Sequence, residues 1–249
     1  MVVVEGLHAT LGETEVLHGV DLRVEDGETL AVIGESGCGK TVLMKAILGL
    51  IPVDRGRIII DGTDTTGFTE REYNQNVRPQ MAIVFQRGAL WDSMTVRENI
   101  DLVLRMRESQ GEEERQRRIE ESLSLVQLSN AADKHPKELS GGMIKRAAIA
   151  RAIAVRPRYL IYDEPTTGLD PVLAGRTNAL IRDLNARLGV TAIVVTHDVR
   201  HLAEFSNRVV MLRDGTVVAN TAADRVWSDE NTELAVFVRG EELKDGRNS

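Results

Sequence analysis

The chain has 249 residues, a formal net charge of −7 and a pI near 5.4, so it lacks the basic surface with which nucleic-acid-binding proteins neutralise phosphates. Hydrophobic residues make up 42% and charged residues 28% of the chain, the balance of an ordinary globular protein with a sizeable core. A single cysteine excludes an internal disulfide, and no stretch reaches the roughly 18 apolar residues of a membrane-spanning helix. We therefore expect a cytoplasmic protein, in which any transport role needs a separate membrane subunit.

The N-terminal part of the chain predicts an antiparallel β layer, a buried strand and a helix. Val2–Leu7, Val16–Val24 and Ile58–Asp61 read as strands of the layer. Leu30–Ile33 is a short continuous apolar run, as expected of a strand that is buried on both faces. Val42–Leu50 has the apolar residues of a helix and is followed by a proline, which cannot continue it.

Between this strand and this helix stands a complete phosphate loop of the pattern G-x-x-x-x-G-K-[ST], Gly34-Glu35-Ser36-Gly37-Cys38-Gly39-Lys40-Thr41. Lys40 is placed to reach the β- and γ-phosphates of a nucleotide, and the Thr41 hydroxyl to ligate Mg²⁺. The glycines let backbone amides approach the phosphates at the start of a helix, whose dipole favours anions. We expect the nucleotide to contact Gly34, Ser36, Gly37, Cys38, Gly39, Lys40, Thr41 and Val42.

Cys38 lies inside this loop, close to Lys40 and to the start of the helix. A neighbouring cation and a helix N-terminus both favour the thiolate, so we expect a reactive thiol whose modification inhibits the protein. The alternative is that Cys38 is a small residue that fits the loop and has no role of its own.

Three further apolar runs predict buried strands. Each is followed directly by polar residues of types that are common in catalytic and binding sites. Met81–Phe85 is followed by Gln86, Tyr159–Tyr162 by Asp163-Glu164, and Ala192–Val195 by Thr196-His197. In open α/β sheets, ligands bind beyond the carboxyl ends of parallel strands. The sequence therefore predicts a parallel sheet with its binding site at these strand ends.

The segment between Gln86 and Arg156 has a helical pattern throughout, with helices expected at Val96–Arg107, Glu112–Gln127 and Gly141–Val155. Ser140 is a good N-cap for the last of these helices. With Gly141 and Gly142 it forms a second candidate anion site at a helix N-terminus.

The C-terminal third predicts one long helix, a hairpin and a short tail. Val172–Leu188 reads as a helix with Asp170 as its N-cap. Asp214-Gly215 joins two short apolar runs as a hairpin turn would. Beyond Asp224 we expect a short helical tail that ends in polar residues from Arg239 on.

A phosphate loop followed by Leu139-Ser140-Gly141-Gly142-Met143 resembles the signature of ATP-binding cassette (ABC) proteins, and the resemblance extends over roughly residues 2 to 225. It implies an α/β fold: a P-loop NTPase (RecA-like) core with an antiparallel β layer and an inserted α-helical subdomain that carries the LSGG signature. We expect one nucleotide-binding domain over 1–249, with the core at about 1–86 and 156–222, the helical subdomain at 87–155 and a tail at 223–249.

The resemblance also implies roles for the residues at the strand ends. Glu164 corresponds to the general base, and Asp163 to the carboxylate of the Mg²⁺ shell. Gln86 resembles the residue that senses Mg²⁺ and the attacking water, and His197 the histidine that contacts the γ-phosphate. Asp170 belongs to the segment that communicates across the dimer, a role that the sequence cannot separate from its capping role. The implied cofactors are ATP and Mg²⁺.

In this family, each signature motif caps the nucleotide that is bound by a second copy, which implies an ATP-sandwich dimer. The resemblance further implies an integral membrane permease as partner, so that the chain would lie peripherally on the cytoplasmic side of the inner membrane. No nucleic-acid partner is expected. Leu11 stands where the family usually has an adenine-stacking aromatic residue, which leaves base discrimination open.

The segment Phe85–Asn99 and the signature helix LSGGMIKRAAIARAIA resemble the ATPases of Mla-type transporters, which move phospholipids with an MCE-domain partner and maintain outer-membrane lipid asymmetry. Osmoprotectant or other small-solute importers are the alternative, since some share Met143. A soluble ABC ATPase of DNA repair or translation is a remote alternative. Leu90, Trp91 and Met94 are expected to line a groove for the permease. The other interpretation is that Trp91 fills the core between subdomains, and the two do not exclude each other.

Overall fold

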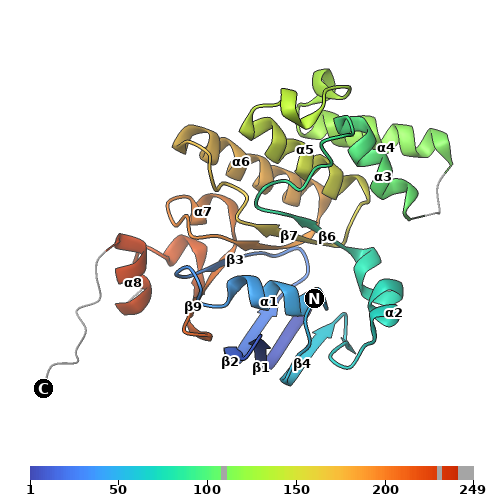
Figure 1. The fold of residues 1–249 in the computed structure, drawn as a ribbon. Helices are drawn as coiled ribbons and strands as arrows, with labels where there is room; N and C mark the ends of the chain where they lie inside the picture. The colour runs from blue at the N-terminus through green and yellow to red at the C-terminus, as the bar shows by residue number, and fades with distance from the viewer. Residues whose placement is uncertain (108–110, 229–231, 241–249) are drawn as a thin grey trace, which may run out of the picture. The chain divides into compact units, whose positions relative to one another are not determined.

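The computed structural model describes residues 1–107, 111–228 and 232–240. Two compact units are distinguished, one formed by Met1–Gly67 with Val195–Ser249 and the other by Phe68–Val194 (Figure 1). Strands and helices occur in both units, so the predicted α/β class is confirmed. Among the described residues, no helix has the length and apolar character needed to span a bilayer. The predicted division into core, helical subdomain and tail stays a prediction.

The first unit contains an antiparallel sheet and three strands of a mixed sheet. Its elements are β1 (Val2–Leu11), β2 (Thr14–Val24), β3 (Thr29–Ile33), α1 (Lys40–Ile47), β4 (Arg55–Ile60), β5 (Thr63–Asp64), α7 (Leu202–Phe205), β9 (Arg208–Arg213), β10 (Thr216–Ala222), η5 (Ala223–Arg225) and α8 (Thr232–Arg239). The polar end of the predicted tail, 241–249, lies outside the described residues.

The predicted antiparallel layer is present in the strand order β2-β1-β4-β5. Along β1, Val2, Val4, Leu7 and Ala9 are buried, because alternate side chains of a strand face the same side of the sheet. The register of β1 shifts between Val4 and Leu7, which keeps both residues on the buried face although they are three positions apart. Helix α1 packs against β1 and β2 (Figure 1).

The second sheet of this unit has the order β10-β9-β3, with β9 antiparallel to β10 and parallel to β3. All five residues of β3 are buried, as its continuous apolar sequence predicts. The predicted hairpin is confirmed as β9 and β10, joined through Asp214 and Gly215, both with positive φ.

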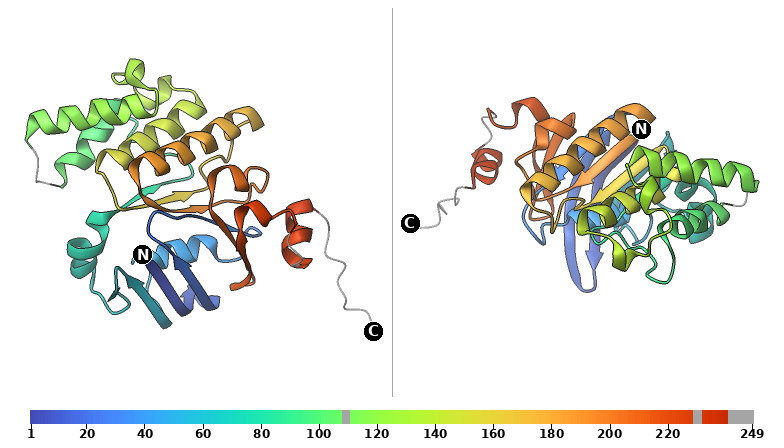
Figure 2. Two further views of the ribbon diagram at one scale, coloured as in Figure 1. Left: turned by 180° about the vertical axis from the view of Figure 1, so that it is seen from behind. Right: turned by 90° about the horizontal axis from the view of Figure 1, so that it is seen from above.

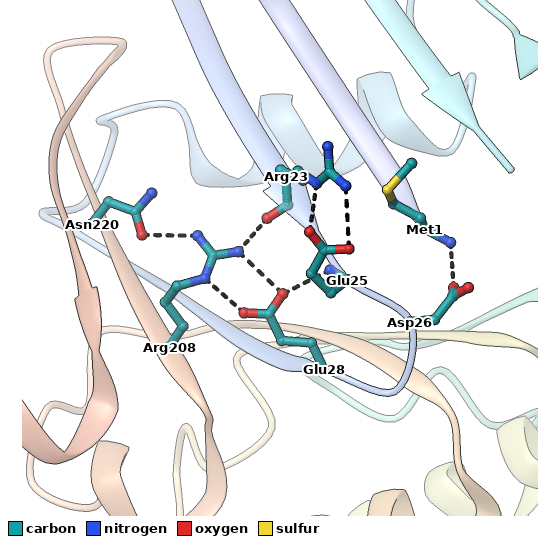
Figure 3. A network of polar contacts seen from close by, with 7 residues as sticks. All are labelled: Met1, Arg23, Glu25, Asp26, Glu28, Arg208 and Asn220. Atoms are coloured by element: carbon teal, nitrogen blue, oxygen red, sulfur yellow. Dashed lines mark hydrogen bonds and ion pairs between the residues drawn. The ribbon is translucent and has the colours of Figure 1, made fainter. Parts of the chain in front are cut away.

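Arg208 on β9 ties these two sheets together through a network of polar contacts (Figure 3). Its guanidinium donates to both carboxylate oxygens of Glu28, at 2.7 and 3.1 Å, to the Asn220 side chain at 2.8 Å, and to the main-chain oxygen of Arg23 at the end of β2. Because one planar group reaches three acceptors on different segments, it holds the edge of the β layer against the hairpin.

The second unit carries the helices that the sequence predicts between Gln86 and Leu188, and the strands β8-β7-β6. Its elements are α2 (Glu70–Glu72), η1 (Tyr73–Val77), η2 (Arg78–Gln80), β6 (Met81–Val84), α3 (Val96–Arg105), α4 (Glu112–Leu125), η3 (Ser129–Ala131), η4 (Pro136–Glu138), α5 (Gly141–Ala154), β7 (Tyr159–Asp163), α6 (Pro171–Leu188) and β8 (Thr191–Val195). Strands β6 and β7 are parallel, with Val84 opposite Tyr162. Helix α5 contacts α3, α4 and α6 (Figures 1 and 2).

The stretch from Thr69 to Gln80 is helical, although the sequence predicted no element there. Thr69 and Glu72 form a capping box, followed by a π-helical turn at η1 and a short 3₁₀ turn at η2. Arg78 binds Glu70 and donates to Asn74 at 2.8 Å, which closes the turns on each other. These polar, local contacts produce no apolar periodicity, so a pattern search does not detect them.

Candidate functional site

The phosphate loop connects β3 to α1 in the first unit, as predicted. Gly34 and Gly39 have φ of 145° and 110°, and a Cβ on Gly34 would lie 2.2 Å from the Leu212 main-chain oxygen. At Gly39 a Cβ would lie 2.7 Å from the Leu17 side chain. Both positions therefore require glycine for steric as well as conformational reasons. They seat the loop between β2 and the β9–β10 hairpin.

The open face of the loop carries Glu35, Ser36, Gly37 and Thr41, all of them exposed. Gly39 caps α1 without a side-chain hydrogen bond, so the start of this helix offers its amides to an anion. Val42 is buried, and only its backbone can face a ligand bound there.

Lys40 is buried beneath the loop, where its ammonium donates to the main-chain oxygens of Gly34 at 2.7 Å and Glu35 at 2.8 Å. These bonds satisfy a cation that would otherwise be costly to bury. These bonds also keep the Lys40 ammonium within the loop, which the sequence predicts to bind phosphates.

The structure contradicts the expectation that Cys38 favours its thiolate form. Burial raises the pKa of the Cys38 thiol, and the nearby Lys40 ammonium, 3.9 Å from Sγ, opposes this effect only in part. Desolvation outweighs the local positive charge because the thiol side chain is enclosed by the folded loop. The alternative of a small residue that fits the loop agrees better with this geometry.

His197 belongs to the same unit as the phosphate loop. The residue before it, Thr196, is buried and donates its backbone N–H to the Val32 main-chain oxygen on β3 at 3.1 Å. The exposed His197 therefore follows a segment that is anchored beside the strand leading into the loop.

Gln86, Asp163 and Glu164 lie together in the second unit. Gln86 follows β6, Asp163 is the last residue of β7, and Glu164 comes next. These two neighbouring parallel strands end side by side, as the sequence predicts. Glu164 has a φ of 50°, a left-handed conformation that is unfavourable for a residue of this size. Its carboxylate accepts a hydrogen bond from the Thr167 hydroxyl at 3.0 Å, which fixes its direction.

The signature segment begins α5 in this unit. Ser140 caps the helix by accepting from the Met143 backbone N–H at 3.4 Å, and both Ser140 and Gly141 are exposed. Asp170 caps α6 with two bonds of 3.0 Å from the N–H groups of Val172 and Leu173. Both predicted capping roles are confirmed.

Sequence reasoning missed Lys145, on the second turn of α5. Its buried ammonium donates to the main-chain oxygen of Gln86 and lies 3.4 Å from that of Glu164. A lysine inside an apolar helical run was the available signal, since burying a cation needs specific partners.

The loop after Gln86 presents Trp91 outward. Its side chain is 59% exposed, so the interpretation of Trp91 as a core residue is wrong. Buried Asn99 holds this loop by accepting from the Trp91 N–H at 2.7 Å and donating to the main-chain oxygens of Trp91 and Met94, each at 3.1 Å. Leu11, at the end of β1 in the other unit, is also exposed.

An open groove of about 960 Å³ lies in the second unit. Phe85, Ala89 and Met106 line it together with several arginines, among them Arg107 and Arg151. The predicted trio Leu90, Trp91 and Met94 is not among the residues that line it.

The donors predicted for Mg²⁺ are a hydroxyl (Thr41), a carboxylate (Asp163) and an amide (Gln86), which are hard oxygen ligands that suit this ion. Among the described residues, no group of three or more His, Cys, Asp or Glu side chains could hold a metal ion by itself.

A family model described as ABC transporter matches residues 17–167 of the chain. The chain belongs to the ABC transporter family. At the level of this family, the prediction of an ABC-type ATPase is confirmed. The sulfate/thiosulfate import ATP-binding protein CysA of Methylococcus capsulatus is 38% identical over 98% of this chain and 70% of its own length. The methionine import ATP-binding protein MetN of Rhizobium johnstonii is 39% identical over 87% of this chain, which spans 59% of that relative.

Solved ABC structures confirm the predicted fold. A dimeric ATP-binding cassette in a post-hydrolysis state, bound to ADP and Pi, has 32% identity and a TM-score of 0.79, covering 90% of this chain and 99% of its own. The cbiO1 protein of Clostridium perfringens, part of the ABC transporter complex cbiONQ, has 27% identity and a TM-score of 0.85, covering 96% of this chain and 94% of its own.

Proposed function

We propose that this chain is the ATP-hydrolysing subunit of a membrane importer for a small polar solute. The observation that carries the proposal is its similarity, over nearly its whole length, to an ATP-binding subunit of sulfate and thiosulfate import. A similar relationship to a methionine import subunit supports the same class of transporter. The exact solute is left to experiment, because an ATP-binding subunit does not carry the solute-binding site.

In the proposed reaction, Lys40 and the amides at the start of α1 bind the β- and γ-phosphates of ATP. Thr41, Asp163 and Gln86 hold Mg²⁺, which neutralises phosphate charge when it is bound. Glu164 accepts a proton from the water that attacks the γ-phosphorus, and the bond to the bridging oxygen breaks to release ADP and phosphate. His197 contacts the γ-phosphate. The fixed direction of the Glu164 carboxylate supports its role as the base.

We propose that hydrolysis takes place between two copies of the chain. Ser140, Gly141 and Gly142 of one copy then bind the nucleotide that the phosphate loop of the other copy holds. The exposed, capped N-terminus of α5 supports this arrangement, since its amides and dipole favour an anion. A solved relative of the same fold is also dimeric.

We propose that the groove lined by Phe85, Met106 and Arg151 receives a short helix of the membrane permease. Phe85 and Met106 are exposed apolar side chains, 39% and 75% accessible, and such patches mark interaction sites. The loop that starts at Phe85 also contains Gln86, so a partner in the groove would act next to the proposed nucleotide sensor. Exposed Trp91, on the same loop, extends this surface.

Phospholipid transport with an MCE-domain protein is the second candidate. The segment Phe85–Asn99 and Met143 favour it, because they resemble the Mla-type ATPases. The relatives named above serve the import of small solutes, which supports the first candidate instead.

Purification of the tagged chain with its membrane partner tests both candidates. We expect a permease to copurify, and the ATPase rate of the reconstituted complex to rise when a solute and its binding protein are added. Sulfate, thiosulfate and methionine are the first solutes to try. Copurification of an MCE-domain protein, with stimulation by phospholipid and by none of these solutes, would establish the second candidate and overturn the first.

A further inference from the structure

Lys145 brings together three segments of the second unit at one ammonium group. The residue lies on α5, and its side chain is only 6% exposed. The ammonium donates to the main-chain oxygen of Gln86, 59 residues away in the sequence, and to that of Glu164 at 3.4 Å, 19 residues away. The proposed function assigns the binding of Mg²⁺ to Gln86, together with Thr41 and Asp163, and the activation of water to Glu164.

The two acceptor segments are the loops that leave β6 and β7. Since Val84 pairs with Tyr162 in these parallel strands, both loops start at the same level of the sheet. Glu164 adopts a φ of 50°, which needs support from its surroundings. The bond from Lys145 supplies such support at the carbonyl of the strained residue itself.

Packing alone does not account for a lysine at this position. Burial lowers the pKa of the Lys145 ammonium, and the carboxylates of Glu164 and Asp163 oppose this effect. Other buried positions on the same helix, such as Ala148 and Ile149, are apolar. An apolar residue of similar length would fill the space without the desolvation cost, so the cation is explained by what it binds.

Lys145 also connects these loops to the signature end of α5. It lies five residues after Ser140, which corresponds to about 7.5 Å along the helix axis. A helix moves as a rigid element over this distance, so a displacement at Ser140 also shifts the ammonium that holds Gln86 and Glu164.

We propose that Lys145 is a positioning residue for ATP hydrolysis: it fixes the Gln86 and Glu164 loops to the signature helix. This inference rests on the proposed roles of Gln86 and Glu164. Lys145 does not touch the reacting atoms; it sets the place of the groups that do. Loss of its hydrogen bonds releases both loops and displaces the general base from the attacking water.

The test compares the complex of the full chain and its copurified permease with a complex that carries Lys145→Met. The variant fills a similar volume but has no donor. We expect kcat to fall about tenfold to a hundredfold, because small displacements of catalytic groups have effects of this size. The KM and Kd for ATP should stay within about twofold, since the phosphate loop is untouched. Lys145→Arg, which keeps the donors, should recover much of the lost kcat.

Arg151 provides the matched control on the same helix. Its guanidinium donates to the main-chain oxygens of Ala89 and, at 2.9 Å, of Gly88, but not to those of Gln86 or Glu164. Arg151→Met thus loosens the same loop without freeing the catalytic residues. Because Arg151 also lines the groove proposed for the permease, Arg151→Met and Lys145→Met are compared as full chains without permease, where we expect kcat to fall less in Arg151→Met.

Several results would overturn the inference: a kcat of Lys145→Met within twofold of the parent, an equal loss in Arg151→Met, or no recovery in Lys145→Arg. If Lys145→Met does not fold, Lys145→Leu, which also has no donor, replaces it in each comparison. Glu164→Gln is measured in parallel. Full turnover in Glu164→Gln would refute the proposed catalytic site itself. If Glu164→Gln loses turnover but Lys145→Met keeps normal turnover, only the proposed role of Lys145 is refuted.

Discussion

At the scale of single residues, the surroundings of a side chain decide its chemistry more than its neighbours in the sequence. Cys38 is next to a helix start and near Lys40, and both favour a thiolate, yet burial raises the pKa of its thiol. Glu164 is exposed enough to react but is held by Thr167 and by a left-handed backbone. Lys145 is a buried cation whose ammonium donates hydrogen bonds to two main-chain carbonyls.

The raised pKa of Cys38 predicts slow labelling by a maleimide at neutral pH. Only the thiolate reacts, and a raised pKa keeps the thiol protonated until the pH exceeds the value of about 8.5 for a free cysteine. The labelling rate of the folded chain should therefore still be rising at pH 9, measured by mass spectrometry. The same chain unfolded in denaturant is the control, and its labelling rate should stop rising at a lower pH. Equally fast labelling of both at pH 7 would contradict the prediction.

At the scale of elements, α3 supports the loop that carries Trp91. Asn99 on this helix is fully buried and makes its hydrogen bonds to the loop backbone between Trp91 and Thr95. An exposed tryptophan on a firmly held turn loses little conformational freedom when a partner binds it, which favours affinity.

Asn99→Ala should lower the free energy of unfolding by about 3 kcal/mol, because buried backbone groups of the loop lose their partner. Urea denaturation followed by circular dichroism measures this change. Asn130→Ala, at an exposed asparagine of the same unit, is the matched control and should stay within about 0.5 kcal/mol of the parent. A similar small effect of Asn99→Ala would show that water replaces its bonds.

Trp91→Glu should leave stability unchanged within about 0.5 kcal/mol, since most of the side chain is exposed. Binding to the permease should be lost, because the interface would have to desolvate a charge without a partner. Pull-down of the permease by the tagged variant gives the readout. Trp227→Glu, at the other tryptophan, which is 48% exposed, is the control and should keep binding. Normal pull-down by Trp91→Glu would exclude this loop from the interface.

At the scale of the whole molecule, neither compact unit contains all of the residues assigned to hydrolysis. The phosphate loop and His197 belong to one unit, and Gln86, Asp163, Glu164 and the signature segment to the other. The proposed reaction therefore uses residues of both units.

Glu164→Gln should bind ATP but not hydrolyse it, because an amide cannot accept the proton of the attacking water. The trapped ATP should hold two copies together, so light scattering of the variant with ATP and Mg²⁺ should give the mass of a dimer. Adding Ser140→Asp keeps a good N-cap but repels the phosphates, and this double variant should remain monomeric. A monomer of Glu164→Gln with ATP bound would count against the composite site.

Short-range patterns in the sequence were enough to predict most elements of the fold and the caps of two helices, whereas the roles of the candidate site residues stay predictions. The phosphate loop, the caps at Ser140 and Asp170, the buried strands and the long helices all depend on near neighbours in the chain, whose types and spacing are visible in one sequence. The turns from Thr69 to Gln80 were missed because capping and polar contacts, not apolar periodicity, produce them.

Only the tertiary structure decided how several side chains are used. The burial of Cys38, the exposure of Trp91 and the position of the groove follow from which distant segments pack together. The contact of Lys145 with Gln86 and Glu164 joins residues far apart in the chain, and no local pattern specifies it. Local propensity is set by neighbours in sequence, whereas desolvation and long-range hydrogen bonds arise only when the folded chain brings distant groups within a few ångströms of each other.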